Sequence, residues 1–303
     1  MKNFKDISYF LHSQQYALDK DNELSSSQMS WLRRDTVDYW RHHRMTEPVM
    51  PFAQHSPGSS WITFGDGRLG LDAQRLKDFE SSINVLPTDI SILLLEKAKQ
   101  LGLIENYSYE NAENLSVEDD SYDYCFCKES FHHFPRPYIA LYEMIRVARK
   151  AVILIEPADD YKKPIPFLVL EGVKLWIKKI IGMPIKHPDF YRFETSGNYV
   201  YTISSRDIEK VAAGLQLPMI GIKYFNDYYE EGVELSMANK SSKLFNRIKS
   251  KIKLLNVMCW FGLTTPTGMV AVIFKELPSE QLINSLKING FRLVDIPTNP
   301  YLK

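Results

Sequence analysis

Between Trp61 and Ile155, short apolar runs alternate with stretches in which apolar residues recur every three or four positions. Uninterrupted apolar runs are typical of parallel strands covered on both faces, and the longer spacing is typical of amphipathic helices. The runs occupy residues 61–64, 83–86, 107–109, 122–127 and 151–155, with helices expected at 71–79, 93–102 and 138–150. The pattern therefore predicts a βαβ array of the α/β class.

After Pro157 this rhythm stops and later returns. Residues 158 to about 202 are expected to form an insertion with one amphipathic helix at 167–181 and a loop rich in Tyr and Phe. Regular structure resumes at Ser204, which is a suitable N-cap for a helix that ends near Leu215. Two late strands, at 220–225 and 269–274, flank a long basic helix, and the tail predicts a helix and an edge strand.

The N-terminal residues have a different texture, rich in aromatic residues and His at helical spacing up to the breaker cluster at 55–60. No Gly/Ser linker divides the chain. We expect a helical N-terminal extension or lid over residues 1–56, a single domain over 57–277 that contains the insertion, and a C-terminal tail over 278–303.

Composition narrows the class of protein. The 303 residues include 37 Lys plus Arg and 37 Asp plus Glu, and 45% are hydrophobic. This balance argues against a disordered chain and provides no basic field for nucleic acid. Three Cys without a CxxC pair favour a reducing compartment over a disulfide framework, and no metal site is expected. Cys125 and Cys127 are expected to be core residues, and the protein is expected in the cytoplasm.

The turn after the first predicted strand carries the first candidate chemistry. Residues 65–70, GDGRLG, have the GxGxxG spacing with which a helix N-terminus approaches a bound dinucleotide. Asp89 ends the second predicted strand, where a carboxylate can accept hydrogen bonds from both hydroxyls of a ribose. Asp89 could instead cap the next helix, since residues 88–91 are TDIS. Turn and acid together indicate a pocket for an adenosine-containing cofactor.

Three later segments narrow the choice of cofactor. Residues 111–115, 119–124 and 129–134 read NAENL, DDSYDY and ESFHHF. Together they resemble the sequence gDaexLPFxdxsFDxVxxxxxxHHf of class I methyltransferases of the type 11 small-molecule group, over roughly residues 58–157. The resemblance implies S-adenosylmethionine as cofactor. It also implies a Rossmann-like, seven-stranded, mostly parallel sheet with helices on both faces and an antiparallel last strand.

The resemblance also assigns roles to individual residues. Gly65 and Gly67 correspond to the turn under the methionine part of the cofactor, Asp89 to the ribose ligand, and Asn111 to the residue that meets the adenine amino group. The cofactor residues that it implies lie on this turn and beside the next strand ends: Gly65, Asp66, Gly67, Asp89, Ile90, Asn111, Ala112 and Lys128.

The chain departs from the family pattern at three positions. Thr63 stands where an acid is common, two residues before the first glycine. Leu69 stands where the third glycine would fall, with Gly70 one place late, and Asn111 replaces an acid. These departures leave open a cofactor site of unusual geometry or reduced affinity.

His132 and His133 are the leading catalytic candidates, and Glu129 is a further one. An imidazole near its ordinary pKa of about 6.5 can accept a proton from a hydroxyl or amine as it attacks a methyl group. Of the two rings His132 is preferred. The alternative is that both histidines only pack between the sheet and the following helix. His42, His43 and Arg44 could line a substrate mouth, although a solvated helix face is the preferred interpretation.

Residues 240–253 combine six basic residues with an apolar stripe at helical spacing and no carboxylate. Such a helix can contact an anionic lipid surface or an anionic substrate, although packing of the stripe on the core with a solvated basic face is the preferred explanation. A second basic cluster, beside Trp176, contains Lys174, Lys178, Lys179 and Lys186.

The sequence as a whole predicts a methyltransferase that uses S-adenosylmethionine, with a small molecule or glycan intermediate as acceptor. A sugar hydroxyl is favoured because the aromatic-rich insertion suits sugar rings. The alternatives are an NAD(P)-dependent oxidoreductase, which fits the glycine turn and Asp89, and a non-catalytic cofactor-binding protein, which fits Thr63 and Leu69. The oligomeric state is not predicted.

Overall fold

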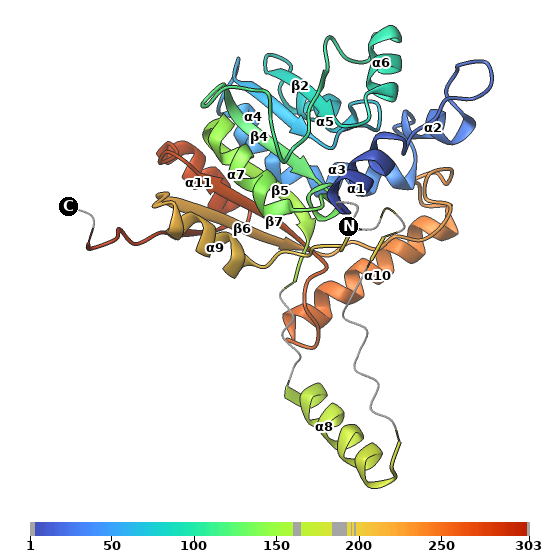
Figure 1. The fold of residues 1–303 in the computed structure, drawn as a ribbon. Helices are drawn as coiled ribbons and strands as arrows, with labels where there is room; N and C mark the ends of the chain where they lie inside the picture. Colours follow the sequence, from blue (N-terminus) through green and yellow to red (C-terminus); the bar gives the residue numbers. More distant parts are fainter. Residues whose placement is uncertain (1–3, 160–164, 184–192, 195, 197, 302–303) are drawn as a thin grey trace.

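The structure is a computed structural model that describes residues 4–159, 165–183, 193–194, 196 and 198–301. The described chain forms one eight-stranded sheet in the order β3-β2-β1-β4-β5-β7-β6-β8, with helices packed around it (Figure 1). The strands are β1 Ser60–Phe64, β2 Asn84–Asp89, β3 Ser108–Tyr109, β4 Tyr122–Lys128, β5 Ala148–Pro157, β6 Met219–Phe225, β7 Gly268–Phe274 and β8 Arg292–Asp295.

The predicted α/β class and its mostly parallel sheet are confirmed. Strands β1 to β5 pair in parallel, and β7 runs antiparallel to both β5 and β6. The sheet has one strand more than the resemblance implies, because the tail adds β8 antiparallel to β6. The carboxyl ends of β1, β2 and β4 consequently meet at one edge, where α/β sheets bind ligands.

The helices follow the pattern of the sequence except at residues 148–150, which the pattern predicts to end a helix and which instead begin β5. They are α1 Phe4–Ser13, α2 Ser26–Trp31, α3 Val37–Thr46, α4 Met50–Gln54, α5 Leu71–Phe79, α6 Leu93–Gln100, α7 Pro137–Val147, α8 Ile165–Ile180, α9 Ser205–Gly214, α10 Lys243–Trp260 and α11 Glu280–Ile288. Ser204 caps α9 as predicted, because its hydroxyl accepts the amide of Asp207. No helix in the described residues is long and apolar enough to cross a bilayer.

Alternate residues of the central strands fill two apolar layers, one on each face of the sheet. On β4, Cys125 and Cys127 belong to one layer and Phe126 to the other, and all three are fully buried. The predicted core role of both cysteines is confirmed. The second layer includes Phe52 of α4 beside Trp61, so the N-terminal extension shares the core of the main domain.

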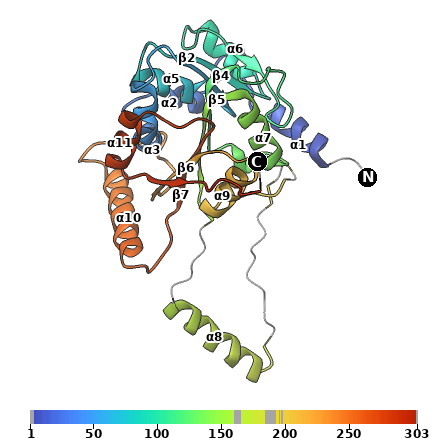
Figure 2. The same ribbon diagram turned by 90° about the vertical axis from the view of Figure 1, so that its left-hand side faces the viewer.

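The apolar stripe of α10 packs against the N-terminal extension. Phe245, Ile248 and Ile252 form a buried cluster with Val37 of α3. The preferred explanation of this stripe as core is therefore confirmed. By contrast, α8 stands away from the body of the molecule, on the side where the C-terminal end of α10 also lies (Figures 1 and 2).

Candidate active site

A cavity of about 300 Å³ opens at the carboxyl ends of β1, β2 and β4. Its volume is at the lower end of the range of roughly 300–1,000 Å³ that is typical of small-molecule sites. Its walls come from these strand ends, the loops that follow them, the start of α5, the helices α1 and α3, and the segment after α1. The wall residues include Tyr9, His12, Tyr16, His42, Gly65, Asp66, Asp72, Arg75, Asp89, Ile90, Asn111, Ala112, Glu113, Lys128, Glu129, Ser130 and His133.

The β1–α5 turn is shaped by two close approaches. Gly65 has a φ of +71°, and a Cβ there would lie 2.3 Å from the side chain of Ser130. A Cβ on Gly67 would lie 2.7 Å from Oδ2 of Asp89, whose carboxylate accepts the amide of Gly67. Only glycine fits at either position, so the turn lies tightly under the cavity.

Thr63 supports this turn. Its hydroxyl donates to Asp66, and the Asp66 carboxylate also accepts the amides of Asp72 and Ala73. Burial raises the pKa of Asp66 to about 7. Asp66 therefore holds the first turn of α5 as well as lining the cavity, and Thr63 supplies it with a partner.

Leu69 occupies the position of the third glycine of the family pattern and adopts a left-handed backbone conformation. Its φ of +61° is left-handed, a conformation that costs a residue with a Cβ about 1–2 kcal/mol. Its side chain is fully buried with Leu94 and Ala98. Apolar packing thus offsets the strain, and Gly70, at φ +65°, makes the second left-handed step before α5 begins.

Asp89 lies on the cavity wall with both carboxylate oxygens engaged by the backbone. Oδ2 accepts the amide of Gly67 at 2.8 Å and Oδ1 accepts the amide of Ser91 at 2.7 Å. Each oxygen keeps a further lone pair, which can accept a hydroxyl. Burial raises the pKa of the carboxyl to about 6. The capping role considered for Asp89 is wrong, because α6 begins at Leu93 with Ile92 as its N-cap and no side-chain cap; Asp89 instead holds the loop before this helix.

The loop after β3 supplies the next part of the wall. Asn111 and the buried Ala112 both line the cavity. The side-chain oxygen of Asn111 accepts the amide of Glu113, which holds this loop in a tight turn. The Asn111 amide group remains the part of the side chain that can meet a ligand.

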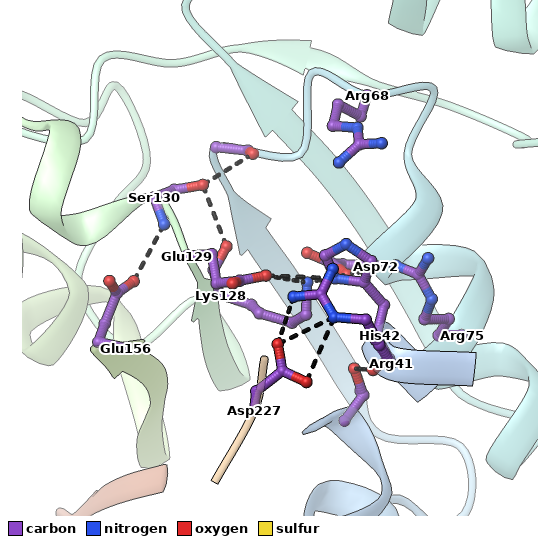
Figure 3. Close-up of polar contacts among 12 residues, drawn as sticks. Arg41, His42, Arg68, Asp72, Arg75, Lys128, Glu129, Ser130, Glu156 and Asp227 are labelled. Atoms are coloured by element: carbon purple, nitrogen blue, oxygen red, sulfur yellow. Dashed lines mark hydrogen bonds and ion pairs between the residues drawn. The ribbon is translucent and has the colours of Figure 1, made fainter. Parts of the chain in front are cut away.

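A network of ion pairs connects the end of β4 to α3 (Figure 3). Oε2 of Glu129 lies 3.2 Å from Nζ of Lys128 and 3.2 Å from Nδ1 of His42. Lys128 also lies 3.4 Å from Asp72. Although burial alone would raise it, Lys128 and His42 hold the pKa of Glu129 well below its usual range. Arg41 of α3 forms a second ion pair with Asp227.

The two candidate histidines lie in different surroundings. Nδ1 of His132 is 2.5 Å from Oε2 of the buried Glu156, and this carboxylate raises the pKa of His132 against the opposing effect of burial. His133 lines the cavity, with Nδ1 2.6 Å from Oε1 of Glu194. Burial and the neighbouring His132 lower the pKa of His133.

The cavity brings together most of the residues that the sequence singles out. All the cofactor candidates line it except Gly67, which lies behind Asp89, and of the catalytic candidates Glu129 and His133 line it. His132, the preferred ring, is not part of the wall, because it turns toward Glu156.

The sequence predicts a lid formed by the N-terminal extension but does not single out which of its residues line the cavity. Tyr9, His12 and Tyr16 line the cavity, and the hydroxyl of Tyr9 donates to Glu113 at 2.7 Å. The preferred view of His42 as part of a solvated helix face is wrong, because its side chain is buried between Asp38 and Glu129. Its position four residues after Asp38 was the available signal.

Residues 64–155 match the family described as a methyltransferase domain. This segment runs from the end of β1 to β5 and contains the glycine turn, Asp89, Asn111 and both histidines. Residues 64–155 are a class I methyltransferase domain. The family suggested by residues 111–134 is therefore confirmed, and with it S-adenosylmethionine as the cofactor of this domain.

Solved structures give weaker likenesses to the methyltransferase domain and its surroundings. The YcgJ protein of Bacillus subtilis is 14% identical with a TM-score of 0.46, covering 78% of this chain and 100% of its own. Magnesium protoporphyrin IX methyltransferase of Synechocystis PCC 6803, solved with S-adenosylhomocysteine, is 13% identical with a TM-score of 0.43, covering 89% and 95%. The family match, rather than these likenesses, carries the assignment. No curated protein matches the chain.

The residues of the methyltransferase domain fit this cofactor. The close approach of Gly67 to Asp89 leaves the carboxylate facing a cavity, with lone pairs for ribose hydroxyls. The positive sulfonium is compatible with the ionised Glu129 at the end of β4, because the low pKa of this carboxyl keeps it charged.

Proposed function

We propose that this protein transfers a methyl group from S-adenosylmethionine to a hydroxyl of a small-molecule or glycan-intermediate acceptor, with His133 as the proton acceptor. The position of His133 on the cavity wall carries this proposal. Its lowered pKa keeps the imidazole neutral at pH 7, which a general base requires. The free thiols Cys125, Cys127 and Cys259 support action in the cytoplasm.

Glu129 and His132 suit other roles. A carboxylate with a pKa held well below its usual range is a weak base, so we assign Glu129 to orienting His42 and to balancing positive charge. The raised pKa of His132 keeps its imidazole protonated to higher pH beside Glu156, so it is ill-suited to accept a proton. This proposal replaces His132 by His133 as the preferred base.

Bound S-adenosylmethionine supplies a methyl group made labile by its positive sulfonium. The protein then has to align the acceptor and exclude water. Alignment of this kind can lower the activation barrier by up to about 7–11 kcal/mol. Helix α1 is suited to cover the cavity, because Tyr9 binds Glu113 and His12 lies 3.3 Å from Asn198. We therefore assign α1 to the lid.

The end of the insertion favours a sugar acceptor. The amide group of Asn198 donates to the carbonyl of His133, and the amide of Tyr201 donates to the carbonyl of His132. The ring of Tyr199 packs edge to face on Tyr201 at 5.1 Å and on Phe193 at 5.7 Å. These rings belong to the segment that contacts the backbone of the histidine loop, and they are not among the residues of the cavity wall. Aromatic rings of this kind are suited to the apolar face of a sugar.

The test is transfer of a tritiated methyl group from S-adenosylmethionine to a panel of nucleotide sugars, small phenols and amines. We expect transfer to a sugar hydroxyl. The product, a methyl ether, should release its tritiated methyl group only under conditions that cleave ethers. Preferred transfer to amines, or transfer that persists unchanged in His133→Asn, would contradict the proposed acceptor atom and base.

A further inference from the structure

Helix α8 carries an exposed apolar stripe. Val173, Trp176, Ile177 and Ile180 follow the i, i+3, i+4, i+7 spacing of one helix face. Their side chains are 49%, 66%, 47% and 63% exposed. A water-soluble surface rarely leaves such a continuous stripe without a partner, and the stripe continues beyond the helix with Ile181, which is 59% exposed.

The other face of α8 is basic. Lys178 lies opposite the stripe, Lys174 and Lys179 flank it on either side, and the exposed Leu175 lies between Lys178 and Lys179. Glu171 is the single acidic residue in the sequence of this helix. An amphipathic helix with Trp on its apolar face and Lys on its polar face is the form that lies in the interface of a bilayer.

A second exposed apolar surface lies at the C-terminal end of α10. Leu254, Val257 and Phe261 share one helix face at 54%, 50% and 63% exposure, and Trp260 is 80% exposed. The preceding turns of the same helix carry five basic residues and no carboxylate: Lys243, Arg247, Lys249, Lys251 and Lys253. The two apolar surfaces thus share the same combination of indole and cationic side chains.

Both views place α8 and the C-terminal end of α10 at the same end of the molecule (Figures 1 and 2). The whole chain has as many acidic as basic residues, whereas α8 and the part of α10 from Lys251 onward contain Lys174, Lys178, Lys179, Lys251 and Lys253 against one acidic residue, Glu171. Cations are therefore locally in excess at this end of the molecule, while Arg247, nearer the start of α10, is paired with Glu230. Lysines beside a negative lipid surface gain attraction, whereas a second copy of this chain would bring like charges together.

We propose that α8 and the C-terminal end of α10 dock this protein on an anionic lipid surface. The apolar stripe of α8 enters the headgroup region, Trp176 and Trp260 lie at the level of the headgroups, and Lys174, Lys178 and Lys179 contact lipid phosphates. The helix lies on the bilayer and does not cross it, since no described helix is suited to span one.

The experiment is co-sedimentation of the full-length protein with vesicles of phosphatidylcholine alone or mixed with phosphatidylglycerol. We expect binding to the anionic vesicles that weakens as salt is added. Trp176→Glu combined with Ile180→Glu should abolish it. Changing Lys174, Lys178 and Lys179 to Gln should weaken it by about fivefold per lysine.

The matched controls lie on α11, where Ile288 is 86% exposed and Lys287 is also exposed. Ile288→Glu and Lys287→Gln should bind vesicles like the wild type, and S-adenosylhomocysteine binding should be unchanged in every variant. The proposal would be overturned if the wild-type protein stayed in the supernatant with anionic vesicles. It would also be overturned if the α8 variants sedimented with these vesicles as well as the wild type does. So would a lipid-free dimer that Trp176→Glu dissociates without any vesicle binding, since the surface would then join two copies.

Discussion

Oε2 of Glu156 lies 2.5 Å from Nδ1 of His132, and Oε1 of the same carboxylate accepts the amides of Ser130 and Phe131. The carboxylate is fully buried at the end of β5. One acid on the neighbouring strand therefore fixes both the backbone of the histidine loop and the ring of His132. His133 is the ring left on the cavity side.

Glu156→Gln should lower the pKa of His132, because the variant keeps the burial and loses the neighbouring charge. In the wild type the folded pKa is raised. The ion pair therefore contributes stability below the unfolded pKa of about 6.5, and this contribution is lost as pH rises through the folded pKa. The variant should be about 1–3 kcal/mol less stable at pH 6, and the difference should shrink as pH rises through the raised folded-state pKa of His132. Denaturant titrations across this range check the difference, and a pH-independent loss would contradict it.

His133→Asn should lower kcat about 10²- to 10⁴-fold with little change in cofactor affinity. His132→Asn should act mainly on stability. His55, an exposed histidine, supplies the control His55→Asn, which should behave as wild type. The wild-type rate should fall as pH drops through a pKa below 6.5, because burial disfavours the protonated form of His133. If kcat fell in His132→Asn but not in His133→Asn, His132 and not His133 would be the proton acceptor.

S-adenosylhomocysteine should bind more weakly as pH falls through about 6, the pKa of Asp89 in the free protein. Hydroxyl donors favour the ionised carboxylate, so affinity is full above that pKa and falls by up to about tenfold per pH unit below it. Asp89→Asn should bind weakly with a flatter pH profile. Titrations of S-adenosylhomocysteine at pH 5 and pH 8 measure this difference. If the affinities of the wild type and Asp89→Asn changed with pH in parallel, Asp89 would be excluded as the cause of the pH dependence.

Tyr9→Phe tests whether α1 acts as a lid. The variant loses the hydrogen bond to Glu113, which should increase the rate of cofactor release while costing at most about 1.5 kcal/mol of global stability. Tyr142→Phe, at an exposed tyrosine of α7, is the control. Stopped-flow displacement measures release, and equal rates in the two variants would mean that α1 does not gate the cavity.

The parts of the site that follow strand ends could be predicted from the sequence. Gly65 and Asp89 each follow an apolar run that predicts a strand, and this pattern is visible in the local sequence. Because neighbouring strands of a parallel sheet end at the same edge, the two residues are expected to meet there. The same logic brings Asn111 and Glu129 to the cavity.

The remaining parts depend on contacts between distant segments. His42 contacts Glu129 only because α3 docks on the strand ends, and periodicity within α3 does not specify that docking. The choice between His132 and His133 depends on Glu156, which lies on another strand. Leu69 shows that a left-handed position usually given to glycine can be held by apolar packing, which no local pattern reveals.

Calorimetric titration of S-adenosylhomocysteine into the wild type and Asp89→Ala tests the central claim most directly. The claim predicts one site per chain in the wild type and an affinity at least about tenfold weaker in the variant, since each charge-assisted hydrogen bond contributes about 1.5–3 kcal/mol. NAD should give no heat of binding. Equal affinity in the two proteins, or binding of NAD without binding of S-adenosylhomocysteine, would contradict the account.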